Sequence, residues 1–289
     1  MTIPYRPFAT TLARRERVGA SFVRLTLTGD LADVGTTLLD QRVKLVLGRP
    51  EALARVAVAG GDWYAAWLDL PEADRPALRT YTLSAARPDA GEVDLDIVAH
   101  GAPDPGSDPG SDPAADTGPG VRFALEAQPG TPVLLVAPDR TRAGHDAVGL
   151  AWRPGDARDL LLVADETALP AVANIARTLP PDARGRIVVE VPTAADARDL
   201  GAPEGVELTW CDRESGDSAL DHLPFGAADA EASEGLLWQE GDGTGARYGW
   251  VAGEAGWVRR IRAGARAAGV PRGQLAFMGY WRRGVAEGA

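Results

Sequence analysis

The stretch Leu160–Ala171, LLLVADETALPA, decides the fold class of the second half of the chain. Its first five residues are all apolar, which is typical of a strand that is buried on both faces of a sheet. The residues that follow predict a helix over Glu166–Leu179. A buried strand that leads directly into a helix is the repeating unit of an α/β domain.

The same alternation continues through the rest of the chain. Strands are expected at Ile187–Val191, Val206–Trp210, Tyr248–Ala252 and Leu275–Tyr280, and a helix is expected at Glu254–Ala268. Strands that alternate with helices in this way predict a mostly parallel, doubly wound sheet.

The first half of the chain has a different rhythm. Ser21–Thr28 and Val93–Val98 alternate apolar and polar residues, and Val43–Leu47 and Val133–Val136 are short apolar runs bounded by turn residues. Such strands predict an antiparallel β-barrel or sandwich. The pattern changes from successive short strands to alternating strands and helices at Arg153–Asp156. We therefore expect an all-β domain over residues 1–155 and an α/β domain over residues 156–289.

Composition excludes several classes of function. The chain has 289 residues, with 41 acidic and 30 basic side chains and a formal charge of −11, so a general nucleic-acid binder is not expected. The single Cys211 excludes an internal disulfide and a Cys-cluster metal site, and the three His residues are too far apart for a local metal motif. From these Cys and His positions we expect no metal site. Because no apolar run has the length of a signal peptide or membrane helix, we also expect no membrane partner and a cytoplasmic protein.

One segment is of low complexity. Ala102–Thr117 reads APDPGSDPGSDPAADT, a near-repeat with four Asp residues and no apolar side chain larger than Ala or Pro. It is expected to be a disordered acidic loop, since it offers nothing to bury.

Arg79-Thr80-Tyr81-Thr82 opens a probable strand and is the first candidate site. Arginine presents a fork of donors that suits a pyrophosphate, and tyrosine offers a flat face to an aromatic ring. Residues 79 and 81 of one strand share a face, so both can contact one ligand. An ordinary exposed strand is the competing interpretation.

The second candidate combines His100-Gly101 with Gly118-Pro119-Gly120. Gly and Pro before a helix leave backbone N–H groups exposed at its start, where a phosphate binds well. His100 follows the Val93–Val98 strand and could stack on a nucleotide or hydrogen-bond to it. A surface or structural histidine is the alternative.

Three candidates lie in the second half. Asp165-Glu166-Thr167-Ala168 follows the first strand of the expected sheet, at the edge where ligands bind, although a G-x-G-x-x-G fingerprint is absent. Ala252-Gly253-Glu254 occupies another strand-to-helix turn, and a helix cap is the alternative for both turns. Trp281-Arg282-Arg283 suits an anionic aromatic ligand, with a solvated basic tail as the alternative.

Together these stretches resemble the siderophore-interacting protein family of flavin-dependent ferric-siderophore reductases, in the ferredoxin–NADP reductase-like superfamily. The resemblance rests on RTYT at 79–82, VDLDIVAHG at 93–101, GPGVRFA at 118–124, QPGTPVLLVAP at 128–138, ADETALPAVANI at 164–175, EVPTAADARDL at 190–200, WVAGEAGWVRRIR at 250–262 and GYWRRG at 279–284. These stretches follow the family's order and span most of the chain.

The resemblance implies a six-stranded, FAD-binding β-barrel, an α/β domain for NADH or NADPH, and a substrate cleft between them. The residues that it assigns to FAD are Arg79, Tyr81, Thr82, His100, Gly101, Gly118, Pro119 and Gly120. It places Thr167 and Ala168 near the flavin or nicotinamide, and Ala252, Gly253 and Glu254 in the nicotinamide site. Because the cofactors carry the chemistry, no catalytic acid or base is expected on the protein.

The implied substrate is a ferric siderophore, and the implied reaction is its reduction with release of Fe(II). Electrons would come from NAD(P)H, or possibly from ferredoxin, through FAD. Ferric siderophores are often anionic, so we expect Lys44, Arg282 and Arg283 to form a basic contact, with Trp281 beside it.

Two departures keep alternatives open. Members often read Arg-x-Tyr-Thr-x-Arg, but Ser84 stands at the second Arg position, and the segment Ala102–Thr117 lengthens a usually short link. Both departures favour a siderophore-binding protein that holds no flavin, and a general flavin or ferredoxin-type reductase is the other alternative. The sequence does not choose between NADH and NADPH, since Arg198, Arg213 and Arg247 are all candidates for a 2′-phosphate. It also leaves open the siderophore and the oligomeric state.

Overall fold

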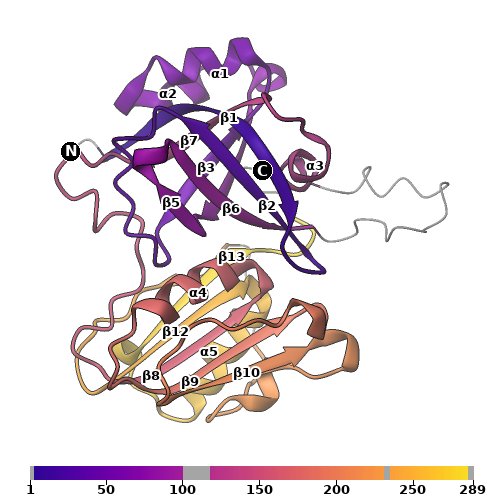
Figure 1. The fold of residues 1–289 in the computed structure, drawn as a ribbon. Helices are drawn as coiled ribbons and strands as arrows, with labels where there is room; N and C mark the ends of the chain where they lie inside the picture. Colours follow the sequence, from indigo (N-terminus) through magenta and orange to yellow (C-terminus); the bar gives the residue numbers. More distant parts are fainter. Residues whose placement is uncertain (1–2, 100–117, 231–234, 286–289) are drawn as a thin grey trace. The chain divides into compact units, whose positions relative to one another are not determined.

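The computed structural model describes residues 3–99, 118–230 and 235–285. The chain forms two compact units that divide between Gly149 and Leu150, and Figure 1 shows one sheet in each of them. The expected site residues His100 and Gly101, and the expected acidic loop Ala102–Thr117, lie outside the described residues.

The first unit is built on a seven-stranded antiparallel sheet with the order β4-β3-β7-β1-β2-β6-β5. Its strands are β1 (Tyr5–Arg17), β2 (Phe22–Gly29), β3 (Arg42–Leu47), β4 (Ala77–Thr82), β5 (Ala85–Arg87), β6 (Glu92–Val98) and β7 (Pro132–Pro138). The resemblance implied six strands. The count is seven because β4 ends at Thr82, and from the Ser84 amide onward the chain hydrogen-bonds to β6, so that β5 forms the other edge of the sheet.

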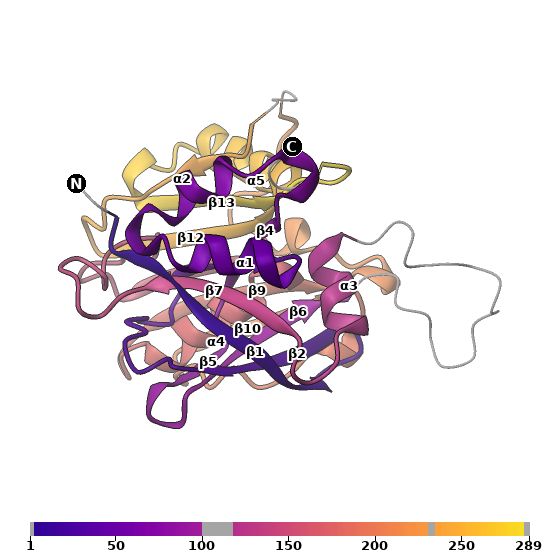
Figure 2. The same ribbon diagram turned by 90° about the horizontal axis from the view of Figure 1, so that it is seen from above.

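Alternation along β3 explains how this sheet is packed on both sides. Val43 and Leu45 point into the core enclosed by the sheet, together with residues of every long strand. Val46 faces the other way and packs under two helices, α1 (Pro50–Ala57) and α2 (Trp63–Leu68), which lie over the sheet in Figure 2. The third helix, α3 (Pro119–Glu126), contacts β2, β3 and β6.

The second unit contains a six-stranded sheet with the order β10-β9-β8-β12-β13-β11. Its strands are β8 (Asp159–Asp165), β9 (Arg184–Val191), β10 (Val206–Asp212), β11 (Trp238–Gln239), β12 (Arg247–Glu254) and β13 (Leu275–Trp281). Five strands are parallel, as expected, and the short edge strand β11 is antiparallel to β13, so the sheet is mixed.

Two helices accompany the parallel strands. The helix α4 (Leu169–Thr178) connects β8 to β9, and α5 (Ala255–Ala267) connects β12 to β13. The two crossovers run in opposite directions from the centre of the sheet, so right-handed connections place the helices on opposite faces. Val163 and Val251 pack against Val258 and Ile261 of α5. The doubly wound arrangement expected from the sequence is therefore confirmed.

The segment after Gly149 packs within the second unit. The Tyr248 hydroxyl donates a hydrogen bond to the carbonyl oxygen of Ala151 at 3.1 Å, and the rings of Trp152 and Tyr248 meet edge to face. These contacts explain why the units divide before residue 150, whereas the sequence placed the boundary after residue 155.

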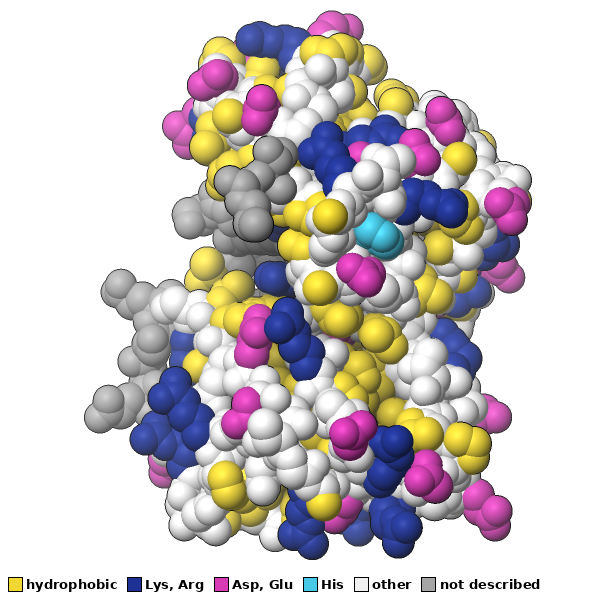
Figure 3. All heavy atoms as spheres, turned by 90° about the vertical axis from the view of Figure 1, so that its left-hand side faces the viewer, with side chains coloured by type: hydrophobic (Ala, Val, Ile, Leu, Met, Phe, Trp, Pro, Cys, Tyr) yellow, Lys and Arg dark blue, Asp and Glu magenta, His cyan; other side chains and the backbone are white. Residues whose placement is uncertain are grey.

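Two surface properties bear on partners. On the face drawn in Figure 3, basic and acidic side chains are interspersed over both units, so the net charge of −11 does not form a uniform acidic surface there. Among the described residues, every helix is too short or too polar to cross a lipid bilayer.

Candidate functional site

The first group of candidate residues lies on β4. Arg79 pairs with Leu45 and Tyr81 pairs with Val43 in the β3–β4 register. Val43 and Leu45 are buried in the barrel core, so Arg79 and Tyr81 share the inner face of the strand. The sequence spacing predicted that the two side chains share a face, and the strand register identifies it as the inner one.

Gly120 of α3 brings the second motif against the first. A Cβ atom on Gly120 would lie 2.0 Å from the Tyr81 hydroxyl and 3.6 Å from Cγ of Arg79. Only glycine allows α3 to approach Tyr81 this closely, because any side chain would displace the phenol ring. Arg79, Tyr81 and residues 118–120 thus form one cluster, which we call the barrel cluster.

The start of α3 gives the barrel cluster its anion-binding chemistry. Gly118 is the N-cap and supplies no capping side chain, and Pro119 occupies the first turn. The first N–H groups of a helix have no partner within the helix, which applies here to the amides of Gly120 and Val121. The Arg79 side chain passes Gly120 with its Cγ, and its guanidinium donates a hydrogen bond to the Leu78 carbonyl oxygen at 2.7 Å. A helix start with an arginine side chain next to it is a chemistry suited to a phosphate group.

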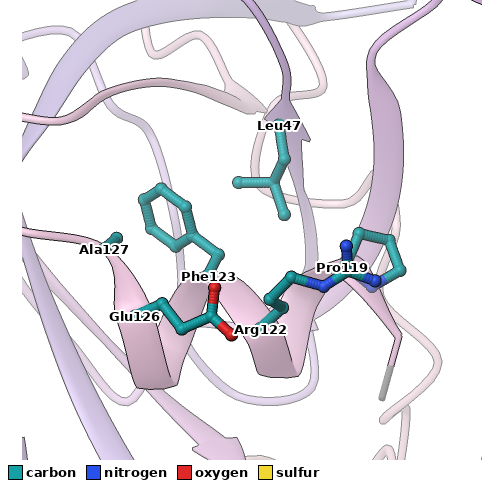
Figure 4. A pocket seen from close by; sticks show the side chains of 6 residues that line it. All are labelled: Leu47, Pro119, Arg122, Phe123, Glu126 and Ala127. Carbon is teal, nitrogen blue, oxygen red and sulfur yellow. The ribbon is translucent and has the colours of Figure 1, made fainter. Parts of the chain in front are cut away.

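A shallow cavity of about 310 Å³ lies beside α3. Figure 4 shows Phe123 of α3 and Leu47 of β3 pointing toward each other, with Arg122 and Glu126 at the rim. An apolar floor with charged groups at its edge suits a flat ring that carries polar substituents.

Two other sequence candidates in this unit lie elsewhere. Thr82 is buried, while Lys44 lies on the opposite face of the sheet from Arg79 and Tyr81. The Lys44 ammonium group donates a hydrogen bond to the Thr80 hydroxyl at 2.7 Å. The structure therefore does not bring Lys44 into the barrel cluster.

Ser84 and Arg87 belong to an ion-pair network on β5 and β6. The Ser84 hydroxyl donates to Asp96, and Arg87 donates to both oxygens of Asp94 at 2.8 Å and to Glu92. Burial raises the pKa of Asp94, but hydrogen bonds from Arg87 and Thr26 outweigh this effect, and the net pKa is lowered. Arg87 is thus held by carboxylates and does not replace the missing second Arg of the motif.

The candidates of the second unit meet at Asp165, the last residue of β8. One oxygen of its buried carboxylate accepts hydrogen bonds from the Thr167 amide at 2.9 Å and the Thr167 hydroxyl at 2.5 Å. The other oxygen accepts from the Glu254 amide at 2.7 Å and from Nε1 of Trp281 at 2.8 Å. We call these residues the Asp165 network.

The Asp165 network gathers motifs from three strand ends. Burial raises the pKa of Asp165 to about 6, and the nearby Glu166 charge adds to the effect, while hydrogen bonds from the Thr167 hydroxyl, the Trp281 ring and the Glu254 amide oppose it. A Cβ atom on Gly253 would lie 2.6 Å from Cγ of Asp165, so glycine is needed where β12 passes the carboxylate. The carboxyl edge predicted as a site is therefore tied together by one side chain.

Glu254 and the C-terminal motif extend this network. The Glu254 carboxylate accepts a hydrogen bond from the Trp257 amide, which caps α5, and another from the Arg283 amide at 3.3 Å. The Arg283 side chain is exposed and that of Arg282 is partly buried. Trp281, Arg282 and Arg283 thus begin at a fixed point of the sheet edge.

The two alanines among the candidates have no exposed side chain. Ala168 and Ala252 are both fully buried. Contact with a ligand at these positions would therefore be made by the backbone.

Sequence reasoning missed a charged cluster beside the Asp165 network. Arg213 forms ion pairs with Glu166 at 2.5 Å and with Glu190 at 3.0 Å, and the Glu166 side chain is buried. The other oxygen of Glu190 accepts from the Ser218 hydroxyl and the Ala219 amide. The available signal was that Glu166 and Glu190 each stand at or beside the end of a buried strand.

Two of the three arginines considered for a 2′-phosphate, Arg213 and Arg247, are also engaged. Arg213 is held by two carboxylates, and Arg247 donates to Asp159 at 2.8 Å. A phosphate would have to compete with these carboxylates for either guanidinium group.

Comparison with known proteins agrees with this division of sites. Residues 11–142 match the sequence profile of the "Siderophore-interacting FAD-binding domain", and residues 157–284 match that of "Siderophore-interacting protein". The barrel cluster lies within the first match and the Asp165 network within the second.

Three individual proteins show the extent of the likeness. An uncharacterised protein of Mycobacterium tuberculosis, Rv2895c, is 32% identical over 92% of this chain and 79% of its own length. The ferric vibriobactin reductase ViuB of Vibrio cholerae is 26% identical over 98% of this chain and 92% of its own. A siderophore utilization protein from T. fusca has a crystal structure that matches with a TM-score of 0.69 and 28% identity, covering 99% of this chain and 96% of that one.

Both units of the chain, and nearly all of its length, thus match proteins of a single kind. With its FAD-binding barrel and its mixed α/β sheet, the chain belongs to the siderophore-interacting protein family.

Proposed function

We propose that this protein is a flavin-dependent reductase of ferric siderophores, which releases iron as Fe(II) with electrons from NAD(P)H or ferredoxin. The observation that carries the proposal is the contact of Gly120 with Tyr81, which sets the Arg79 side chain beside the start of α3. This cluster lies in the unit that matches the FAD-binding domain of the family. The similarity to ViuB, a ferric vibriobactin reductase, supports the choice of substrate class.

The barrel cluster fits FAD in the chemistry of its groups. Arg79 and the amides of Gly120 and Val121 would bind the pyrophosphate, which needs several donors and positive charge. The ring of Tyr81 would lie against the flavin, and buried Thr82 follows it on the same strand. When bound, FAD supplies the conversion between a two-electron donor and a one-electron acceptor.

The Asp165 network would position the donor side of the reaction. Asp165 fixes Thr167, the Glu254 amide and the Trp281 ring at the carboxyl edge of the sheet, where ligands of such folds bind. We propose that Thr167, Ala168 and the turn Ala252–Glu254 line the nicotinamide site, with Ala168 and Ala252 contributing backbone groups.

The substrate contact would come from the C-terminal motif. Arg282 and Arg283 would attract an anionic ferric siderophore to a protein whose net charge is −11, and Trp281 would cover an aromatic group. Lys44 is a separate candidate, since it lies on the other face of the sheet from Arg79.

Release of iron follows from metal–ligand chemistry. Siderophores hold Fe(III) through hard oxygen ligands, and Fe(II) binds such ligands far more weakly. Once the electron is transferred, no acid or base on the protein is required for the metal to leave.

The test measures flavin binding and iron reduction separately. The purified protein is titrated with FAD, and the loaded protein is supplied with NADH, NADPH or reduced ferredoxin under anaerobic conditions together with a ferric siderophore and a chromophoric Fe(II) chelator. We expect FAD binding and donor-dependent formation of the Fe(II) complex. Siderophore binding without any FAD uptake would replace the proposal with a flavin-free binding protein. FAD binding with reduction of simple acceptors only would replace it with a general flavin reductase.

A further inference from the structure

Three side chains with metal-binding atoms converge in the second unit, outside the Asp165 network. They are Cys211 at the end of β10, Asp217 and His222. One ligand atom from each residue lies within 4.8 Å of the other two, and Nε2 of His222 is 2.9 Å from Oδ1 of Asp217. We propose that these residues form a binding site for one thiolate-preferring divalent cation of the Zn²⁺ class.

The chain holds the three groups on a fixed framework. Cys211 is fully buried in the same apolar cluster as Ala219 and Leu223, which flank His222 in the chain. The Ala219 amide donates to Glu190, and the Asp217 amide donates to the carbonyl oxygen of Asp212. The donors therefore come from a packed strand and a hydrogen-bonded turn, which lowers the entropy that a ligand must overcome.

The donor set matches the coordination chemistry of zinc. Zinc binds thiolate sulfur, imidazole nitrogen and carboxylate oxygen with four ligands in a tetrahedron, and its bonds of 2.0–2.3 Å place ligand atoms roughly 3.5 Å apart. Atoms that now lie within 4.8 Å of one another need only small side-chain rotations to reach this spacing. Three protein ligands leave the fourth position to water.

The surrounding charge also favours a cation. The carboxylates of Asp217 and Asp221 interact electrostatically with the Cys211 sulfur, whereas the nearby Glu190 is paired with Arg213. Negative potential that opposes a bare thiolate attracts a divalent ion, and the ion replaces the thiol proton as it binds. The Arg186 guanidinium, which contacts the His222 carbonyl oxygen, is itself paired with Glu207.

Cobalt is the most informative probe, because a flavin-bearing protein absorbs strongly in the blue. Untagged, FAD-loaded protein is titrated with Co²⁺ and followed by its d–d absorption in the red, where oxidised flavin does not absorb. We expect one equivalent of Co²⁺ to give the intense bands of a four-coordinate site and Zn²⁺ to displace it. Absence of these bands, or weak bands typical of octahedral Co²⁺, would mean that the three residues are only a hydrogen-bonded cluster.

Variants assign the binding to these residues. Cys211→Ser should abolish the four-coordinate spectrum, and His222→Gln should lower Zn²⁺ affinity by at least about tenfold, as loss of a ligand requires. Cys211 is buried, and its replacement could disturb folding. The test therefore relies on His222→Gln and Asp217→Asn, which change partly exposed residues. His145→Gln, in the first unit, is the matched control and should bind as wild type. Equal affinity in wild type, His222→Gln and Asp217→Asn would overturn the proposal.

Discussion

The barrel cluster and the Asp165 network are assembled in opposite ways. In the barrel cluster, the absence of a side chain at Gly120 lets the start of α3 approach Tyr81 of β4. In the Asp165 network, a buried carboxylate meets four donors and holds three strand ends together. The first arrangement depends on a missing side chain, whereas the second depends on one side chain that accepts four hydrogen bonds.

The pKa values of two carboxyl groups, one in each unit, are also shifted in opposite directions. Hydrogen bonds from Arg87 and Thr26 overcome burial at Asp94 and lower its pKa, whereas burial raises the pKa of Asp165. Asp94 therefore stabilises the fold above about pH 4 and loses this contribution as the pH falls. Asp165 destabilises the fold when it is ionised, so its effect on stability is relieved as the pH falls through about 6. A lower pH therefore changes the stability contributions of Asp94 and Asp165 in opposite directions.

The largest effect is expected from Asp165→Asn on the pH dependence of stability. Between about pH 4 and pH 6 the unfolded carboxyl ionises while the folded one stays protonated, so wild-type stability falls by roughly 3 kcal/mol as the pH rises through this window. The Asn variant cannot titrate, so its stability should not show this fall with rising pH. Denaturant unfolding of both proteins from pH 4 to pH 7.5 measures the difference. A difference that does not change with pH would show that Asp165 is ionised throughout.

A matched substitution calibrates that measurement. Asp159 lies on β8, the same strand as Asp165, and forms an exposed ion pair with Arg247 of β12. Asp159→Asn removes this ion pair. Exposed ion pairs contribute about 0–1 kcal/mol, so this variant should follow the wild-type pH profile closely.

Arg79→Ala should have the next largest effect, on FAD affinity. Loss of a charge-assisted phosphate contact costs about 1.5–3 kcal/mol, which corresponds to roughly 10- to 150-fold in the dissociation constant. Arg87→Ala is the comparison, because Arg87 is held by Asp94 and Glu92 and should hardly affect FAD binding. FAD titration of the two variants measures both constants. Similar constants would mean that the flavin phosphates lie elsewhere.

Gly120→Ala should weaken FAD binding by about tenfold. The new methyl group would displace Tyr81, and overpacking of this kind costs about 1–3 kcal/mol. Gly118→Ala is the control, since a Cβ atom there meets nothing within 4 Å. Stopped-flow or equilibrium titration with FAD distinguishes the pair. If both variants bind as wild type, close approach of α3 to Tyr81 does not shape the cofactor site.

Local patterns predicted most of the fold because they depend on neighbours in sequence. The shared face of Arg79 and Tyr81 follows from the two-residue period of a strand, and the parallel sheet follows from the order of strands and helices. Strand β1 was not predicted for two reasons. A bulge between Leu12 and Arg14 shifts the alternation of apolar and polar residues, and the C-terminal end of the strand is charged. The short helix α2 has only six residues, too few to show a helical period.

The contacts that build the sites could not be read from such patterns. The Trp281–Asp165 hydrogen bond joins residues 116 positions apart, and the pairing of Arg213 with Glu166 spans 47 positions. The sequence placed Thr167, Glu254 and Trp281 at one edge of the sheet, but it gave no reason to choose Asp165 as their common partner. Lys44 shows the same limit, because its strand face depends on register.

The smallest effect is expected from the double change Arg282→Ala/Arg283→Ala. The Arg283 side chain is exposed and that of Arg282 partly so, and contacts of this kind contribute up to about 1 kcal/mol each. We therefore expect KM for an anionic ferric chelate to rise by roughly three- to tenfold, with kcat unchanged. Salt screens such attraction, so the difference from wild type should shrink as ionic strength increases. A neutral ferric chelate is the matched control and should be reduced with the same KM by both proteins. Equal KM values for the anionic chelate at low salt would place the substrate away from this tail, and the Asp165–Trp281 bond would then serve only to hold the end of β13.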